Sequence, residues 1–218
     1  MPSLARSVMQ TLYGANLWDG FAPERVSEEV QGWNGDHSAL QRLTSEHGSR
    51  FVVDVGVWKG QSTITLANAM KLSGIDGCVV AVDTFLGSPE HWSCLGGLFS
   101  RLNGRPDLYE TFLANVHAAG LTDYVVPLPQ TSVTAAAVLR HFGIRPEIVH
   151  VDAAHEYADV LRDVEEYWGL LAPGGFLIGD DYVQAWPGVV QAAGEFSARV
   201  RCPIQVEAPK WILQKPSS

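Results

Sequence analysis

From about residue 50 onward, the sequence alternates short apolar runs with longer amphipathic segments. We expect the apolar runs to be buried strands, at residues 51–55, 78–83, 123–128, 147–152 and 176–180. Between them, apolar residues recur at helical spacing, as in Tyr109, Phe112, Leu113 and Val116. Strands that alternate with helices form βαβ units with right-handed crossovers, which produce a parallel sheet. This pattern predicts an α/β fold with helices on both faces of the sheet.

The last part of the chain changes character. After a helix expected over residues 187–200, two short strands are predicted at residues 204–207 and 211–214. They follow each other so closely that we expect an antiparallel hairpin, with Ala208, Pro209 and Lys210 in its turn. The predicted fold class is therefore an α/β three-layer sandwich with a seven-stranded, mostly parallel sheet and an antiparallel C-terminal strand.

Residues 1–49 lie outside the alternating pattern and are expected to form an N-terminal helical extension of the domain at residues 50–218. Leu4, Val8 and Leu12 predict one short helix. Leu40 and Leu43 predict a second, with His37 or Ser38 near its start. The sequence leaves three roles open for this extension: to cover a site, to form a dimer contact, or to enlarge the core.

Charge and hydropathy exclude several classes of protein. The 15 basic and 24 acidic residues give a net charge of −9, which disfavours binding to nucleic acid. No apolar run approaches the roughly 18 residues that a membrane span needs, and no signal peptide is evident. We therefore expect a cytoplasmic protein without a membrane partner, and a homo-oligomer is compatible with the sequence. Three separate cysteines, expected to be free thiols, form no CxxC pair: Cys78, Cys94 and Cys202.

Glycine and acidic residues follow the first two predicted strands. In an open parallel sheet, ligands bind beyond the carboxyl ends of the strands. Gly56 and Gly60 flank the turn after the first strand, where glycine lets the backbone approach a ligand closely. Their GxxxG spacing differs from the GxGxxG dinucleotide fingerprint and from the phosphate loop. Asp83 ends the second strand, where a carboxylate can accept hydrogen bonds from a ribose diol or can instead cap a turn.

Three more acids, Asp152, Asp180 and Asp181, follow the fourth and fifth predicted strands. If those strands are neighbours, their ends lie about 5 Å apart and the carboxylates share one small region. Like charges that close are costly unless a cation neutralises them, and hard divalent cations prefer oxygen ligands. The alternative is that one acid caps a loop while another faces solvent.

His155 follows Asp152 by three residues, just before a predicted helix. Its imidazole can act as a general base near neutral pH, or it can be a helix N-terminal residue without a chemical role. The helix itself carries apolar residues on one face, from Tyr157 to Leu171. Its acids are expected to form a solvated face: Glu156, Asp159, Asp163, Glu165 and Glu166.

The long segment at residues 86–105 has no clear periodicity but contains His91, Trp92 and Phe99. Connections of this length are often lids or binding loops, so we expect it to shape the pocket of a substrate. A disordered surface excursion is the alternative, and the aromatic residues argue against it.

Four stretches resemble a known family: FVVDVGVWKGQST, VVAVDTFLGSPEHW, IVHVDAAHEYADVLRDVEEYWGLLAPGGFLIGDDY and KWILQK. They are similar to the class I S-adenosylmethionine-dependent methyltransferases, which share a Rossmann-like fold. The resemblance extends over roughly residues 30–215. It is strongest to the branch with macrocin-type sugar O-methyltransferases and proteins named for cephalosporin hydroxylase.

The resemblance implies a role for each matching residue. Those on the S-adenosylmethionine side would be Asp54, Gly56, Gly60 and Ser62 near the methionine part, Asp83 and Thr84 near the ribose, and Gln130, Thr131 and Ser132 near the adenine. Asp152, Asp180 and Asp181 would be ligands of Mg²⁺, and His155 together with Asp152 would be catalytic. Many members have Gly-Asp or Gly-Asn before this histidine, whereas this chain has Ala153-Ala154, so a second candidate base is missing.

We therefore expect metal-assisted O-methylation of a small polyhydroxylated acceptor. A metal ion that binds the acceptor hydroxyl lowers its pKa, and His155 can then take the proton. Three alternatives remain open: a metal-independent methyltransferase of the same fold, a protein that binds a nucleotide cofactor without methyl transfer, and an NAD-dependent oxidoreductase. The missing GxGxxG motif argues against the last.

Overall fold

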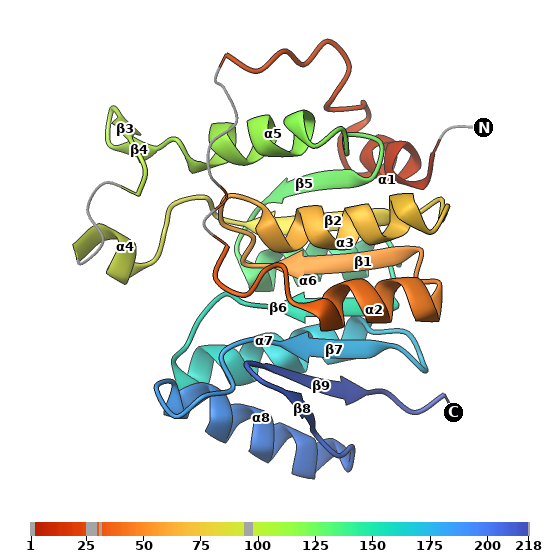
Figure 1. The fold of residues 1–218 in the computed structure, drawn as a ribbon, viewed down its shortest axis with the longest axis vertical. Coiled ribbons are helices and arrows are strands. Elements are labelled where there is room, and N and C mark those ends of the chain that lie inside the picture. Colours follow the sequence, from red (N-terminus) through yellow and green to blue (C-terminus); the bar gives the residue numbers. More distant parts are fainter. Residues whose placement is uncertain (1–2, 25–29, 31, 94–97, 218) are drawn as a thin grey trace.

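A computed structural model describes residues 3–24, 30, 32–93 and 98–217 of the chain. Its centre is a seven-stranded sheet with the strand order β5-β2-β1-β6-β7-β9-β8 (Figure 1). The strands are β1 Phe51–Val55, β2 Cys78–Asp83, β5 Val125–Pro129, β6 Ile148–Val151, β7 Phe176–Gly179, β8 Gln205–Glu207 and β9 Lys210–Gln214. The first five run parallel, and β9 pairs antiparallel with both β7 and β8. This arrangement confirms the predicted fold class.

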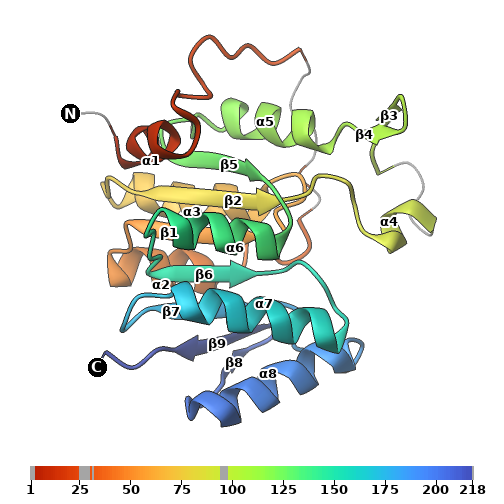
Figure 2. The same ribbon diagram turned by 180° about the vertical axis from the view of Figure 1, so that it is seen from behind.

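Helices cover both faces of the sheet. One face carries α2 Ser38–His47, α3 Gln61–Leu72 and α5 Leu108–Ala118 (Figure 1). The opposite face carries α1 Leu4–Tyr13, α6 Ser132–His141, α7 Tyr157–Leu170 and α8 Pro187–Val200 (Figure 2). Because both faces are covered, the central strands are almost continuous runs of valine and other apolar residues rather than alternating ones. The result is a three-layer sandwich with one apolar core on each side of the sheet.

The N-terminal helices are parts of these two cores. Ala5, Val8 and Met9 of α1 are buried together with residues of β2 and β5, and Leu40 and Leu43 of α2 pack on the side of α3. For these two helices, the contacts establish enlargement of the core among the three roles that the sequence left open. No helix in the described part of the chain is long and apolar enough to span a membrane.

Two local features add to or differ from the sequence-based expectation, whereas the described cysteines agree with it. Within residues 86–105, the described parts form a short helix, α4 Pro89–Ser93, and a small hairpin of β3 Arg101–Leu102 and β4 Arg105–Pro106. Cys94 lies outside the described residues, whereas Cys78 and Cys202 are free and buried. Lys210 does not belong to the hairpin turn: it is the first residue of β9, it pairs with Glu207, and its side chain is fully buried.

The order of strands locates a crevice. From β1 the chain adds β2 and β5 on one side. It then returns to the other side of β1, where it adds β6, β7 and the final hairpin. The strand order therefore reverses between β1 and β6, and a ligand crevice is expected at the carboxyl ends of these two strands.

Candidate functional site

A cavity of about 320 Å³ opens at the carboxyl ends of β1, β2, β5 and β6. We call it the cofactor cavity, because residues that the resemblance implies for cofactor binding line it. Those that the sequence had singled out are Gly56, Asp83, Thr84, Gln130, Thr131, Ser132 and Asp152. The fold thus brings together residues from four separate strand ends.

The turn after β1 requires glycine for steric reasons. Gly56 has a φ of +84°, and a Cβ on it would lie 1.9 Å from the carbonyl oxygen of Asp152 on the neighbouring strand. Gly60 begins α3 with a φ of +103°. Only a residue without a side chain fits such an approach, so the turn can pass close to the end of β6 and leave space for a ligand.

Asp83 is held in place by backbone groups. Its Oδ2 accepts a hydrogen bond from the Trp58 amide at 2.9 Å, and its Oδ1 accepts one from the Phe85 amide at 2.7 Å. The sequence had offered a turn cap and a ribose-binding carboxylate as alternatives, and these contacts show the turn role while the side chain also lines the cavity. Burial raises the pKa of Asp83, and the backbone amides oppose that shift.

Asp54 and Ser62 lie behind the cavity wall instead of lining it. The Asp54 carboxylate is fully buried, and its Oδ2 accepts hydrogen bonds from Ser62 Oγ at 2.8 Å and Thr63 Oγ1 at 2.6 Å. These bonds join β1 to the start of α3. Gly60 is likewise absent from the described lining, so these predicted residues support the turn from beneath.

A buried chain of polar groups continues from Asp54 to Asp180. Asp54 Oδ1 lies 2.7 Å from His150 Nδ1, and His150 Nε2 lies 3.0 Å from Lys210 Nζ. Because an ammonium group only donates, Nε2 accepts and Nδ1 carries the proton that is donated to Asp54. Burial, and then the charge of Lys210, lower the pKa of His150, which keeps this imidazole neutral.

Lys210 is the functional residue that the sequence reasoning missed. Its Nζ lies 2.5 Å from Asp180 Oδ2, and both side chains are almost fully buried. The chain therefore supplies a cation of its own to one of the three carboxylates that were expected to bind a metal.

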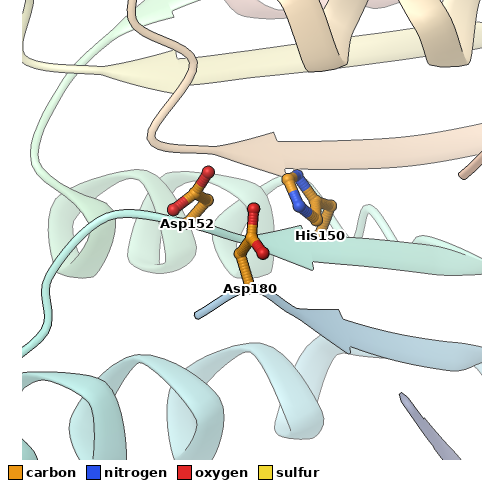
Figure 3. Close-up of side chains that lie close together, drawn as sticks. All are labelled: His150, Asp152 and Asp180. Atoms are coloured by element: carbon orange, nitrogen blue, oxygen red, sulfur yellow. The ribbon is translucent and has the colours of Figure 1, made fainter. Parts of the chain in front are cut away.

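The carboxylates form two overlapping groups around Asp152. Potential ligand atoms of His150, Asp152 and Asp180 lie within 4.8 Å of one another, as Figure 3 illustrates for these three side chains. The same holds for Asp152, His155 and Asp181. Burial, and then the charge of Asp180, raise the pKa of Asp152 well above its ordinary value. Burial and a neighbouring negative charge thus disfavour the charged form of Asp152. A hard divalent cation, which prefers oxygen ligands, would stabilise that form.

His155 contacts Asp181 and Trp186, which both follow β7. Its Nε2 lies 2.8 Å from Asp181 Oδ2, and its ring stacks on the indole of Trp186 with centroids 4.1 Å apart. A neutral imidazole that donates through Nε2 presents Nδ1 as its proton acceptor. The imidazole thus has the carboxylate partner and the fixed orientation that a general base needs.

A second cavity, of about 410 Å³, lies on the other side of Asp152. We call it the aromatic cavity, because Trp33, Trp58, His91 and Trp186 line it together with His155 and Asp181. It shares several lining residues with the cofactor cavity: Gly56, Trp58, Ser88, His91, Asp152 and Ala153. Part of segment 86–105 thus borders both cavities.

Asp163 corrects the expectation of a fully solvated acidic face on α7. It is buried, it accepts a hydrogen bond from Ser132 Oγ at 2.6 Å, and it lines the cofactor cavity. Burial raises its pKa to about 6. A signal was present in the sequence, since Asp163 stands at helical spacing from Val160 and Tyr167 of the apolar face.

Comparison with known proteins gives a family and a fold. Residues 53–182 match the family model described as a methyltransferase domain. The structure is similar to an O-methyltransferase from Bacillus cereus in complex with SAH, at 18% identity, a TM-score of 0.58, and coverage of 96% of this chain and 91% of that one.

Two further solved structures extend this comparison. An O-methyltransferase of tomaymycin synthesis from Streptomyces achromogenes, in complex with SAM, is 16% identical, with a TM-score of 0.59 and coverage of 96% and 95%. A TDP-rhamnose 3′-O-methyltransferase of calicheamicin biosynthesis is 19% identical, with a TM-score of 0.57 and coverage of 81% and 76%. A search of curated protein sequences gives no match. At these identities, the solved structures establish a shared fold.

Proposed function

Since this chain belongs to the methyltransferase domain family, we propose that it transfers a methyl group from S-adenosylmethionine to a hydroxyl oxygen of a small-molecule acceptor. The observation that carries this proposal is the pair of cavities that meet at Gly56 and Asp152. Methyl transfer is a displacement in which nucleophile, methyl carbon and sulfur must be aligned. Two adjoining cavities provide one space for the cofactor and one for the acceptor.

The cofactor cavity suits S-adenosylmethionine. Asp83 lies at the end of β2, where a carboxylate can accept hydrogen bonds from both ribose hydroxyls. Thr84 lies beside it, and Gln130, Thr131 and Ser132 are on the side expected for the adenine. Gly56 lines both cavities and has no side chain, so we assign the sulfonium end of the cofactor to this turn.

In the reaction, the acceptor O–H proton passes to His155, and the oxygen lone pair forms the new bond to the methyl carbon. The bond between carbon and sulfur breaks, its electron pair returns to sulfur, and S-adenosylhomocysteine results. His155 accepts the proton at Nδ1 while its Nε2 donates to Asp181. Asp152, at the boundary of the two cavities, orients the acceptor hydroxyl.

We further propose that Asp152, Asp180 and Asp181 hold a divalent cation, Mg²⁺ by its preference for oxygen ligands. Asp180 and Asp181 each belong to a compact group of potential ligands that includes Asp152. When bound, such a cation lowers the pKa of the acceptor hydroxyl. Charge balance supports it: Lys210 offsets one of the three carboxylates, and a divalent cation would offset the other two while His155 is neutral.

A metal-independent methyltransferase is the second candidate, and a specific observation favours it. Asp180 is paired with Lys210 and Asp181 with His155, so Lys210 neutralises one carboxylate and a hydrogen bond from His155 stabilises another without a metal. In that case the acids orient the acceptor and the imidazole.

Calorimetric binding tests both proposals. S-adenosylhomocysteine is titrated into the wild type and into Asp83→Ala, and Mg²⁺ is titrated into the wild type and into Asp152→Asn. We expect cofactor binding that Asp83→Ala weakens, and binding of Mg²⁺ that Asp152→Asn abolishes. Asp123→Asn, an exposed acid before β5, is the matched control. Absence of cofactor binding to the folded wild type would refute methyl transfer, and turnover that is unchanged in EDTA would favour the metal-independent candidate.

A further inference from the structure

The side chains that line the aromatic cavity indicate what kind of acceptor it binds. This inference rests on the methyl transfer proposed above. Two sets of rings line this cavity. In the first, Trp58 and His91 stack with centroids 4.0 Å apart at 26°, and Trp33 lies 5.8 Å from His91 at 22°. The second is Trp186, which is stacked on His155. Aromatic side chains therefore border the space next to the expected base.

These rings are held in position by polar contacts. The Ser88 amide donates a hydrogen bond to His91 Nδ1 at 3.0 Å, so the proton of the neutral ring is on Nε2. The Trp58 amide is bound to Asp83, and Trp58 adopts a φ of +51°, which is uncommon for a residue with a side chain. Because little ordering is then required on binding, a ring that fits the cavity binds more tightly.

The charges around the cavity determine what else can enter. Among the described residues that line it there is no lysine or arginine, whereas Asp152 and Asp181 both line it. Nearby Arg101 stacks over Trp92 and Phe99, at 4.3 and 4.9 Å, and is not a lining residue. A divalent cation between the carboxylates would balance them without leaving a surplus of positive charge. A phosphate group in this cavity would therefore face these carboxylates without a lysine or arginine partner among the described lining residues.

We infer that the aromatic cavity is the acceptor site and that it takes an uncharged hydroxylated ring. The flat face of the ring packs on the indoles, and its reacting hydroxyl is directed to Asp152 and His155. A volume of about 410 Å³ suits one or two rings. Phosphorylated and nucleotide-linked forms of the same ring are rejected. An aromatic diol and the C–H face of a sugar both have the required chemistry.

Two matched pairs of probes test this inference. Binding of catechol and catechol monophosphate, and of methyl glucoside and glucose 1-phosphate, is measured by saturation-transfer NMR on the protein saturated with S-adenosylhomocysteine. We expect the uncharged member of at least one pair to bind about tenfold more tightly than its phosphate. The pair that responds distinguishes an aromatic acceptor from a sugar.

Two variants locate the binding. Trp186→Ala is expected to weaken the uncharged probe about tenfold while the affinity for S-adenosylhomocysteine stays within about twofold. Trp33→Ala should act in the same direction. Because the Trp33 side chain is 54% exposed, we expect this variant to fold. The control is Phe142→Ala, an exposed aromatic residue after α6. Phosphates that bind as well as the uncharged probes, or no binding by any uncharged probe, overturn the inference. Failure of S-adenosylhomocysteine to bind refutes the proposed function instead.

Discussion

Lys210 Nζ lies 2.5 Å from Asp180 Oδ2 in the interior of the protein, where neither side chain has appreciable contact with solvent. The pair joins β9 to the end of β7, beside the carboxylates of the proposed site. A buried ion pair is costly to form, but it is far more costly to leave one partner alone. The pair therefore makes the stability of the fold dependent on the charges of the site.

We expect Lys210→Met to lower the free energy of unfolding by about 3–5 kcal/mol, because Asp180 is left charged and buried without its partner. The double variant Asp180→Asn/Lys210→Met removes both charges and should recover most of that loss. Urea denaturation of the single and double variants measures this. Lys71→Met is the control, since Lys71 is exposed on α3 and should change stability by no more than about 0.5 kcal/mol. Equal losses in the single and double variants would contradict the assignment.

Replacement of Asp83 tests the cofactor cavity. Asp83→Ala removes a charged acceptor of hydrogen bonds, so the Kd for S-adenosylhomocysteine should rise by about 10- to 150-fold. Calorimetry gives the Kd, and circular dichroism checks that the fold is retained. Asp123→Ala, at the opposite end of the sheet, should leave the Kd unaltered. An unaltered Kd in Asp83→Ala would mean that this carboxylate only caps its turn.

Asp163 should make stability depend on pH. Its pKa is raised by burial from the ordinary value of 3.8 to about 6 in the folded protein. The folded state therefore holds this proton more tightly than the unfolded state, and the contribution to stability is complete below pH 4 and is lost as the pH rises through 6. We expect Asp163→Asn to be more stable than the wild type by roughly 2–3 kcal/mol at pH 7.5 and equal to it at pH 4.

The measurement for Asp163 is urea denaturation across this pH range. Glu165→Gln is the control, because Glu165 is exposed on the same helix and is not among the groups that shift the pKa of Asp163. A difference between Asp163→Asn and the wild type that is the same at every pH would show that the raised pKa is not its cause.

His155→Ala should lower kcat by about 10²- to 10⁴-fold, which is the usual contribution of a general base. The affinity for S-adenosylhomocysteine should be retained, since His155 lines the aromatic cavity and is not among the residues that line the cofactor cavity. Transfer of labelled methyl groups to the preferred uncharged probe measures the rate. His141→Ala, on the exposed end of α6, is the control. A kcat that stays within a few-fold of the wild type would assign His155 a structural role.

The sequence predicted the fold well because the strands are valine-rich runs that end in polar residues. The predicted bounds of β1, β2 and α8 agree with the structure. The approach of Asp152 and Asp180 was also predictable, given that β6 and β7 are neighbours. Residues that close a strand are placed by topology, and topology follows from the alternating pattern.

Lys210 and the ring contacts were not predictable in the same way. Lysine is almost always exposed, so a lysine between two short strands is read as a turn residue. Its partners, Asp180 and His150, are 30 and 60 residues away in the sequence. The stacking of Trp186 on His155 depends on how the chain enters α8, which no local pattern specifies. The burial of Asp163, in contrast, was predictable, since its spacing from Val160 and Tyr167 places it on the apolar face of α7.

The order in which the ribosome makes these residues has a consequence for the nascent polypeptide. Asp54, His150, Asp152 and Asp180 all leave the exit tunnel before Lys210 does. Until β9 docks beside β7, Lys210 does not offset the mutual repulsion of these acids, although the parallel strands around them have already been synthesised. Docking of the final hairpin therefore brings Lys210 to Asp180 and balances one charge of the carboxylate cluster.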